Sequence, residues 1–174
     1  MTKNSQTLPI KFAESVEFTI PGFDTRPPIV LGFNAISQGE KRLIEAKNVN
    51  GGTYSELEYV YNEGYRESRK HLTVVGYEMA QTQKILRRLR SEYLLDDYPE
   101  FLKEKGLKDN SANREAFLTR QGDYVAALDR ADLLNAISSL LENKIKVFEN
   151  VCRYMKKEID ILVRSGMVNN KYTS

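Results

Sequence analysis

Mostly apolar side chains recur at steps of four and three residues between Tyr61 and Tyr93. Ten positions keep this alternation without a break, which places all of them on one stripe of a helix. A capping-box pair, Thr53 and Glu56, precedes the stripe. We therefore predict one helix over residues 54–95, about 60 Å long at 1.5 Å per residue. The ten positions are Tyr61, Tyr65, Ser68, Leu72, Val75, Met79, Thr82, Leu86, Leu89 and Tyr93.

A longer repeat of the same kind runs from Phe117 to Leu162. A straight helix drifts about 20° per heptad away from such a line, so a repeat of this length is typical of a helix that coils around a partner. We expect it to pair with the first helix and to end at the C-cap residue Gly166. The repeat consists of Phe117, Arg120, Tyr124, Ala127, Ala131, Leu134, Ser138, Leu141, Ile145, Phe148, Cys152, Met155, Ile159 and Leu162.

Residues 1–52 have a different pattern, with four of the five prolines in the chain and five of its ten glycines. Near-alternation from Ile10 to Ile20 and the apolar run from Ile29 to Phe33 predict two short strands. A short helix is expected between Gln38 and Lys47. A two-stranded hairpin is marginal in water, so we expect it to lie against the helices or a neighbouring subunit.

The predicted fold is mainly α: two long heptad-patterned helices in an antiparallel helical hairpin, with an N-terminal Pro/Gly-rich arm that contains β-strands. The arm covers residues 1–52, the hairpin and oligomerisation domain covers 53–166, and residues 167–174 form a flexible tail. Between the long helices, Pro99 and Gly106 bound a short helix, and the sequence Asp109-Asn110-Ser111 supplies capping residues for the next one.

The composition is compatible with many functions but gives little support for catalysis. The chain has one cysteine and one histidine, and it lacks a Walker loop, a GxSxG motif and an HExxH motif. We predict no catalytic, cofactor-binding or metal site and no enzymatic activity. His71 is more readily explained as a packed or surface side chain, and Cys152 as a small buried apolar residue. We find no signal peptide or bilayer-spanning run and expect a cytoplasmic protein.

Basic residues concentrate on the first long helix, although the formal net charge of the whole chain is only +2. Seven basic and two acidic residues lie between Arg66 and Arg90, and several basic ones share one helix face, on which they can follow a phosphate backbone. An aromatic ring on that face can stack on a base. We predict single-stranded DNA binding by Arg66, Arg69, Lys70, Tyr77, Lys84, Arg87 and Arg88. The simpler alternative is that these charges pair with acidic neighbours on a packed helix.

The length of the two apolar stripes predicts a homo-oligomer, because one hairpin does not need so much apolar surface. On the second helix, the residues expected at the interface between copies are Leu134, Leu141, Ile145, Phe148, Met155 and Ile159.

The segment that begins NREAFL and continues into the long repeat, after a helix rich in Tyr, Glu and Arg, resembles the UvsY-like recombination mediators of phages. The similarity covers residues 54–165. It implies a ring-shaped oligomer that binds single-stranded DNA and helps to load a RecA-type recombinase, in the host cytoplasm if the gene is a phage gene.

Three functions follow as hypotheses. The first is a single-stranded DNA-binding accessory protein for phage recombination. The alternative is a structural or assembly protein, such as a virion component or helical scaffold, and a third is a terminase-like subunit that acts on duplex DNA. The salt dependence of single-stranded DNA binding separates the first two, because counterion release makes phosphate binding steeply salt-dependent. A preference for duplex over single strands would indicate the third.

Overall fold

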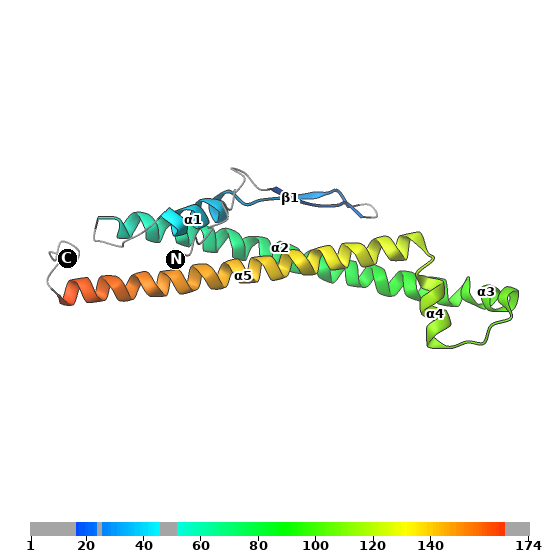
Figure 1. The fold of residues 1–174 in the computed structure, drawn as a ribbon. Coiled ribbons are helices and arrows are strands. Elements are labelled where there is room, and N and C mark those ends of the chain that lie inside the picture. The colour runs from blue at the N-terminus through cyan, green and yellow to red at the C-terminus, as the bar shows by residue number, and fades with distance from the viewer. Residues whose placement is uncertain (1–16, 24–25, 46–51, 166–174) are drawn as a thin grey trace, which may run out of the picture. The chain divides into compact units, whose positions relative to one another are not determined.

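The computed structural model describes residues 17–23, 26–45 and 52–165. Within these ranges the chain is mainly helical, with one small sheet of two paired strands (Figure 1). The strands are β1 (Glu17–Ile20) and β2 (Ile29–Gly32), and the helices are α1 (Asn34–Glu45), α2 (Tyr54–Leu95), α3 (Tyr98–Lys105), α4 (Ser111–Leu118) and α5 (Gly122–Arg164).

The long helix α2 has the bounds that its apolar repeat predicts, Tyr54 and Leu95. The short elements agree less closely. Helix α1 begins at Asn34, four residues before the predicted start, and of the predicted strand from Ile10 to Ile20 only residues 17–20 fall among the described residues. Gly106 ends α3 with a φ of 61°, the left-handed conformation that favours glycine at a helix C-terminus.

The prediction of one helix from Phe117 to Leu162 is wrong at its start. The backbone N–H groups of Arg120 and Gln121 donate to the carbonyls of Phe117 and Leu118, at 3.1 and 3.0 Å. These bonds reach back three residues instead of four, which closes α4, and α5 starts afresh at Gly122. Arg120 therefore lies exposed in a turn, although the repeat counts it as a packed position.

Contacts group the described residues into two compact units, and both α2 and α5 pass through each of them. The sequence-based division at residues 52 and 166 follows the order of the chain, whereas the packing combines segments that are distant in sequence. Unit 1 contains residues 17–18, 32–45, 52–67 and 147–165, and unit 2 contains residues 19–23, 26–31 and 68–146.

Unit 1 is organised around the fully buried ring of Phe148. A Cβ atom added at Gly39 of α1 or at Gly64 of α2 would lie 2.6 Å from a carbon of this ring. The two glycines therefore let two helix backbones approach one aromatic side chain. The carboxylate of Glu67 accepts a hydrogen bond from the backbone N–H of Ile36 at 3.0 Å, which satisfies a donor in the first turn of α1.

Unit 2 has a core of aliphatic and aromatic side chains from four helices. Three aromatic rings pack together where α3 meets α4: the ring centroids of Tyr98 and Phe117 are 5.3 Å apart, and those of Phe101 and Phe117 are 5.1 Å apart. Such pairs contribute roughly 0.5–1.5 kcal/mol beyond the burial of their area. The buried members of this core are Leu86, Leu89, Tyr98, Phe117, Leu118, Tyr124, Ala127 and Ala131.

Candidate nucleic-acid interface

The buried side of α2 in unit 2 carries several polar side chains. Ser68, His71, Glu78 and Thr82 are each 8% exposed or less. The carboxylate of Glu78 accepts a hydrogen bond from Nη2 of Arg130 on α5 at 2.9 Å, and Nε of Arg130 donates to the hydroxyl of Thr82 at 3.3 Å. A buried carboxylate requires such a partner because burial removes its hydration. The other terminal nitrogen of Arg130, Nη1, is buried with no hydrogen-bond partner among the described residues.

Glu78 also binds a second cation, Arg26, from the segment between β1 and β2. Nη1 of Arg26 lies 3.0 Å from the second carboxylate oxygen of Glu78. The guanidinium carbon is 5.6 Å from the centroid of the Tyr77 ring, a distance typical of a cation–π contact. Hydrogen bonding to Tyr77 and the nearby carboxylate of Glu78 raise the pKa of Arg26 above its ordinary value. One carboxylate thus holds two arginines, one buried and one partly exposed.

The outward face of α2 in unit 2 is basic because Glu78 is turned inward. Between Arg69 and Ser91, no acidic side chain is exposed and six basic ones are. The exposed residues of this stretch are Arg69, Lys70, Thr73, Gly76, Tyr77, Ala80, Gln83, Lys84, Arg87, Arg88, Arg90 and Ser91. We call them the α2 basic face.

The basic residues of this face differ in how far they are already neutralised. Arg88 lies 3.8 Å from Glu92, and Arg90 binds the carboxylate of Glu115 at 2.7 Å. In contrast, Lys70, Lys84 and Arg87 form no ion pair with any described residue. These three side chains are thus the ones whose charge is most available to a phosphate.

The seven residues predicted to bind DNA are all on α2, and six of them lie on the α2 basic face. The seventh, Arg66, belongs to unit 1 and pairs with Glu63 at 2.7 Å. Tyr77 is 56% exposed, but Arg26 lies over its ring. One side of the Tyr77 ring is therefore already in contact with a cation and is not open to stacking by a base.

Sequence reasoning missed Arg26 and Arg130. Both are separated from Glu78 by 52 residues along the chain, so no local spacing links them. The only available signal was the position of Glu78, directly before the predicted packed position Met79 of α2. A carboxylate buried there needs a basic partner, because burial of an unpaired charge is costly.

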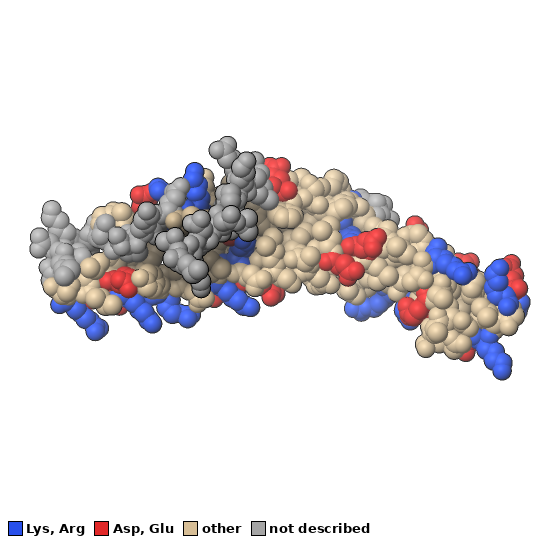
Figure 2. All heavy atoms as spheres, in the orientation of Figure 1, with Lys and Arg blue, Asp and Glu red and all other residues tan. Residues whose placement is uncertain are grey.

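A second group of basic residues lies on α5. Exposed residues in its second half include Lys146, Arg153, Lys156, Lys157 and Arg164, whereas its first half exposes acidic side chains. In Figure 2, acidic side chains are seen over the first half of α5 and basic ones along its second half. Glu149 and Asp160 are exposed among the basic residues, so this surface is of mixed sign.

Of the six residues predicted to form an oligomer interface, five are buried within the single chain. Leu134, Leu141 and Phe148 are 0% exposed, and Ile145 and Met155 are also buried. Ile159 is half-buried. The five buried residues thus already pack within one chain, and their role between copies stays a prediction.

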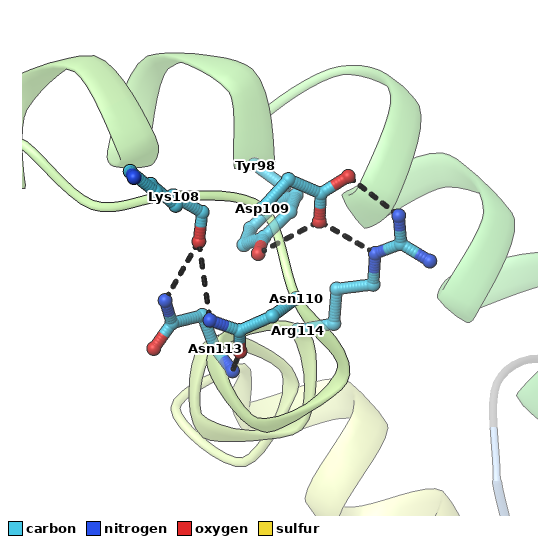
Figure 3. A network of polar contacts seen from close by, with 6 residues as sticks. All are labelled: Tyr98, Lys108, Asp109, Asn110, Asn113 and Arg114. Atoms are coloured by element: carbon cyan, nitrogen blue, oxygen red, sulfur yellow. Dashed lines mark hydrogen bonds and ion pairs between the residues drawn. The ribbon is translucent and has the colours of Figure 1, made fainter.

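Polar side chains also gather where α3 is connected to α4 (Figure 3). Asp109 accepts hydrogen bonds from Nε and Nη2 of Arg114, at 2.8 and 2.5 Å, and from the hydroxyl of Tyr98 at 3.3 Å. The side-chain oxygen of Asn110 accepts from the backbone N–H of Asn113 at 2.8 Å, which makes Asn110 the N-cap of α4. These residues satisfy one another's hydrogen-bonding groups, so the network stabilises the start of α4.

Few other groups offer chemistry in the described part of the chain. No three His, Cys, Asp or Glu residues gather there as they would to hold a metal ion. Cys152 is half-buried, and burial raises the pKa of its thiol, which disfavours the reactive thiolate. An open pocket of about 220 Å³ lies in unit 2, smaller than the roughly 300–1,000 Å³ of typical ligand pockets. It is lined by Phe23, Ile85, Arg88, Leu89 and Asp123.

No helix in the described ranges is both long enough and apolar enough to cross a membrane. Comparisons with protein-family models, with curated proteins and with solved structures each find no match to this chain.

Proposed function

We propose that the protein binds single-stranded nucleic acid through the α2 basic face. The observation that carries this proposal is the absence of exposed acidic side chains between Arg69 and Ser91, together with six exposed basic ones. A strand of phosphates gains affinity from each cation that displaces its counterions. At 1.5 Å per residue, the stretch from Arg69 to Arg90 is roughly 30 Å long, which gives several phosphates a cation on one continuous helix.

The hairpin and its heptad seam are part of this proposal. Glu78 of α2 contacts Arg130 of α5, and Arg90 contacts Tyr124, so residue numbers rise on one helix as they fall on the other. In unit 1, Phe148 lies beside Tyr61 and Gly64, whereas Tyr54 interacts electrostatically with Asp160, so the same relation holds. These contacts support an antiparallel pairing of α2 with α5 within each unit.

The resemblance to UvsY-like mediators supplies the biological setting that we propose. In that setting the protein is an oligomeric accessory factor for phage recombination in the host cytoplasm, and a RecA-type recombinase is its partner.

The test replaces Lys84, Arg87 and Arg88 together by alanine. The logarithm of affinity for an oligonucleotide such as poly(dT) is plotted against the logarithm of salt concentration. For a single strand the slope changes by about 0.7 for each phosphate that is no longer neutralised, so removal of three cations flattens it by at most about 2. Alanine has high helix propensity, so α2 should keep its helicity.

The matched control replaces Lys103, Lys105 and Lys108 by alanine. These lysines are exposed, lie outside the α2 basic face and carry the same total charge. We expect the control to keep the wild-type slope. The proposal fails if the wild-type protein does not bind in a salt-dependent way, or if both variants change the slope equally. A preference for duplex over single strands would favour the terminase-like alternative.

A structural or assembly role is the second candidate, and an apolar line on α5 favours it. Val147, Tyr154 and Ile161 are spaced seven residues apart and are 42%, 59% and 59% exposed. Such spacing suits contact with another helix. Replacement of Tyr154 and Ile161 by serine should lower the average mass in solution if this line joins copies of the chain.

A further inference from the structure

Unit 2 displays two helix faces of opposite charge. The α2 basic face exposes no acidic side chain, and the first half of α5 exposes no basic one between Gly122 and Asn143. The one arginine in that part of α5, Arg130, is buried against Glu78. The exposed residues there are Gly122, Asp123, Ala126, Asp129, Asp132, Asn135, Ala136, Ser139, Glu142 and Asn143, which we call the α5 acidic face.

Both faces carry charges that form no ion pair with any described residue. Asp129 and Asp132 on the acidic face form no ion pair with a described residue, and the same is true of Lys84 and Arg87 on the basic face. In each pair the two charged residues are three positions apart, so they lie on adjacent turns of their helix.

Small residues lie beside the charged ones on both faces. Thr73, Gly76 and Ala80 lie on the α2 basic face, and Ala136 and Ser139 on the α5 acidic face. A Cβ atom added at Gly76 would meet nothing within 4 Å, so this glycine is not required by packing within the described chain. A glycine in the middle of a helix costs roughly 0.5–1 kcal/mol relative to alanine. Its position on an outward face suits the close approach of another helix.

We propose that the α5 acidic face of one copy binds the α2 basic face of a second copy. If the helices are antiparallel and Arg87 lies opposite Asp129, Lys84 lies opposite Asp132, because both pairs are spaced by three residues. The same register places Ala80 opposite Ala136 and Thr73 opposite Asn143. Two ion pairs are thus followed by mostly small side chains, with one large residue, Tyr77, opposite Ser139. This sequence permits close helix packing without a large apolar patch.

Charge complementarity is the reason for choosing a second copy of this chain as the partner. Exposed ion pairs contribute about 0–1 kcal/mol each, so the contact is weak and sensitive to salt. Because each copy has one face of each sign, the contact joins unlike surfaces and leaves one basic and one acidic face open at its ends.

A regulatory consequence rests on the proposed function. If the α2 basic face binds nucleic acid, phosphates and the α5 acidic face of a neighbour compete for Lys84 and Arg87. Nucleic-acid binding and this contact between copies then exclude each other at the α2 basic face. More bound nucleic acid means less self-association, and stronger self-association lowers the affinity for nucleic acid.

The test is a pair of charge reversals, Lys84→Glu/Arg87→Glu and Asp129→Lys/Asp132→Lys, studied by sedimentation equilibrium at low salt. Each variant alone brings like charges together, so we expect its self-association to weaken at least about tenfold. An equimolar mixture restores association, since the reversed faces of the two variants are complementary. Near 1 M salt, where the Debye length is about 3 Å, the wild-type protein should lose the same contact.

A steric variant, Gly76→Leu, separates this contact from a change in folding. A Cβ atom at this position meets nothing within 4 Å, and leucine has a higher helix propensity than glycine, so helicity should be kept or increased while self-association weakens. The proposal is overturned if association in the mixture is no stronger than in the single variants, or if neither salt nor Gly76→Leu weakens the wild-type contact.

Nucleic-acid binding by Asp129→Lys/Asp132→Lys distinguishes the two proposals. This variant keeps the α2 basic face, so it should bind an oligonucleotide at least as tightly as the wild-type protein. Loss of self-association without any nucleic-acid binding supports the contact between copies and rejects the proposed function. If the protein binds nucleic acid and neither charge reversal changes its self-association, the proposed function is supported and the contact between copies is rejected.

Discussion

The buried ion pair between Glu78 and Arg130 should be the most sensitive polar contact in unit 2. Replacement of Glu78 by methionine leaves the guanidinium of Arg130, whose side chain is 4% exposed, without a countercharge. Loss of one partner from a buried pair costs about 3–5 kcal/mol, because the remaining ion keeps its desolvation penalty. For a chain of this length, that loss corresponds to a fall of roughly 6–20 °C in melting temperature.

The reciprocal change should cost less. In Arg130→Met the carboxylate of Glu78 still has Arg26 at 3.0 Å, and the side chain of Arg26 is 33% exposed to water. The double variant Glu78→Met/Arg130→Met removes both buried charges and roughly conserves volume. A hydrophobic pair of similar size is often neutral or more stable by about 1–4 kcal/mol. The expected order of stability is therefore the double variant first, then Arg130→Met, then Glu78→Met.

Urea unfolding followed by far-ultraviolet circular dichroism measures all four proteins at one concentration, since self-association changes apparent stability. Equal losses in the two single variants, with a double variant that shows their sum, would refute the reasoning. That outcome means that water reaches the pair and that the two charges act independently.

Two further predictions concern other sites. In unit 1, Gly64→Ala should destabilise the chain by about 1–3 kcal/mol because its Cβ meets the Phe148 ring, whereas alanine at a helical position is otherwise favourable; thermal melting checks this. Hydrogen bonding to Arg114 lowers the pKa of Asp109, so this carboxylate stabilises the fold above its ordinary pKa and the contribution is lost as pH falls through the lowered value. In Arg114→Ala, an NMR titration should find the pKa of Asp109 nearer its ordinary value, and an unchanged pKa would contradict the assigned cause.

Local periodicity was sufficient to predict the long helices, because the heptad line and the capping residues are both visible in sequence. Periodicity did not identify the side of α2 that is buried most deeply. The repeat selects Leu72 and Met79, which are half-buried, whereas the neighbouring polar residues His71 and Glu78 are buried. The favoured side depends on Arg130, which is distant in the chain, so pattern alone could not reveal it.

The break between α4 and α5 was missed for a related reason. Phe117 is buried whether or not the helix continues past it, so the apolar repeat does not register a turn. The turn is instead seen in the backbone N–H groups of Arg120 and Gln121, each of which donates to the carbonyl three residues earlier. Neither residue has the conformational preferences of proline or glycine, and the repeat continues through them in register.

The charge of the candidate site could not be predicted from sequence either, because it depends on which charged side chains are buried. Counting charges along α2 sets Glu78 against the basic residues, which makes the face look less basic than it is. Burial of Glu78 between Arg26 and Arg130 removes its carboxylate from the outward surface. Its negative charge is thus neutralised inside unit 2, and the exposed stretch from Arg69 to Ser91 keeps only positive charge.

This division of roles leads to a last prediction, that stability and nucleic-acid affinity respond to different residues. Glu78→Met/Arg130→Met alters the buried pair and leaves every exposed lysine and arginine of the α2 basic face in place. Its salt dependence of oligonucleotide binding should therefore match that of the wild-type protein, even where its urea midpoint differs. Lys84→Ala/Arg87→Ala/Arg88→Ala should do the reverse, with a flatter slope and an unchanged midpoint, since exposed substitutions seldom shift stability by more than about 0.5 kcal/mol. A double methionine variant that folds with wild-type stability but loses binding would show that the buried pair contributes to the interface itself, and the separation of charge between the inside and the outside of α2 would then be the wrong explanation.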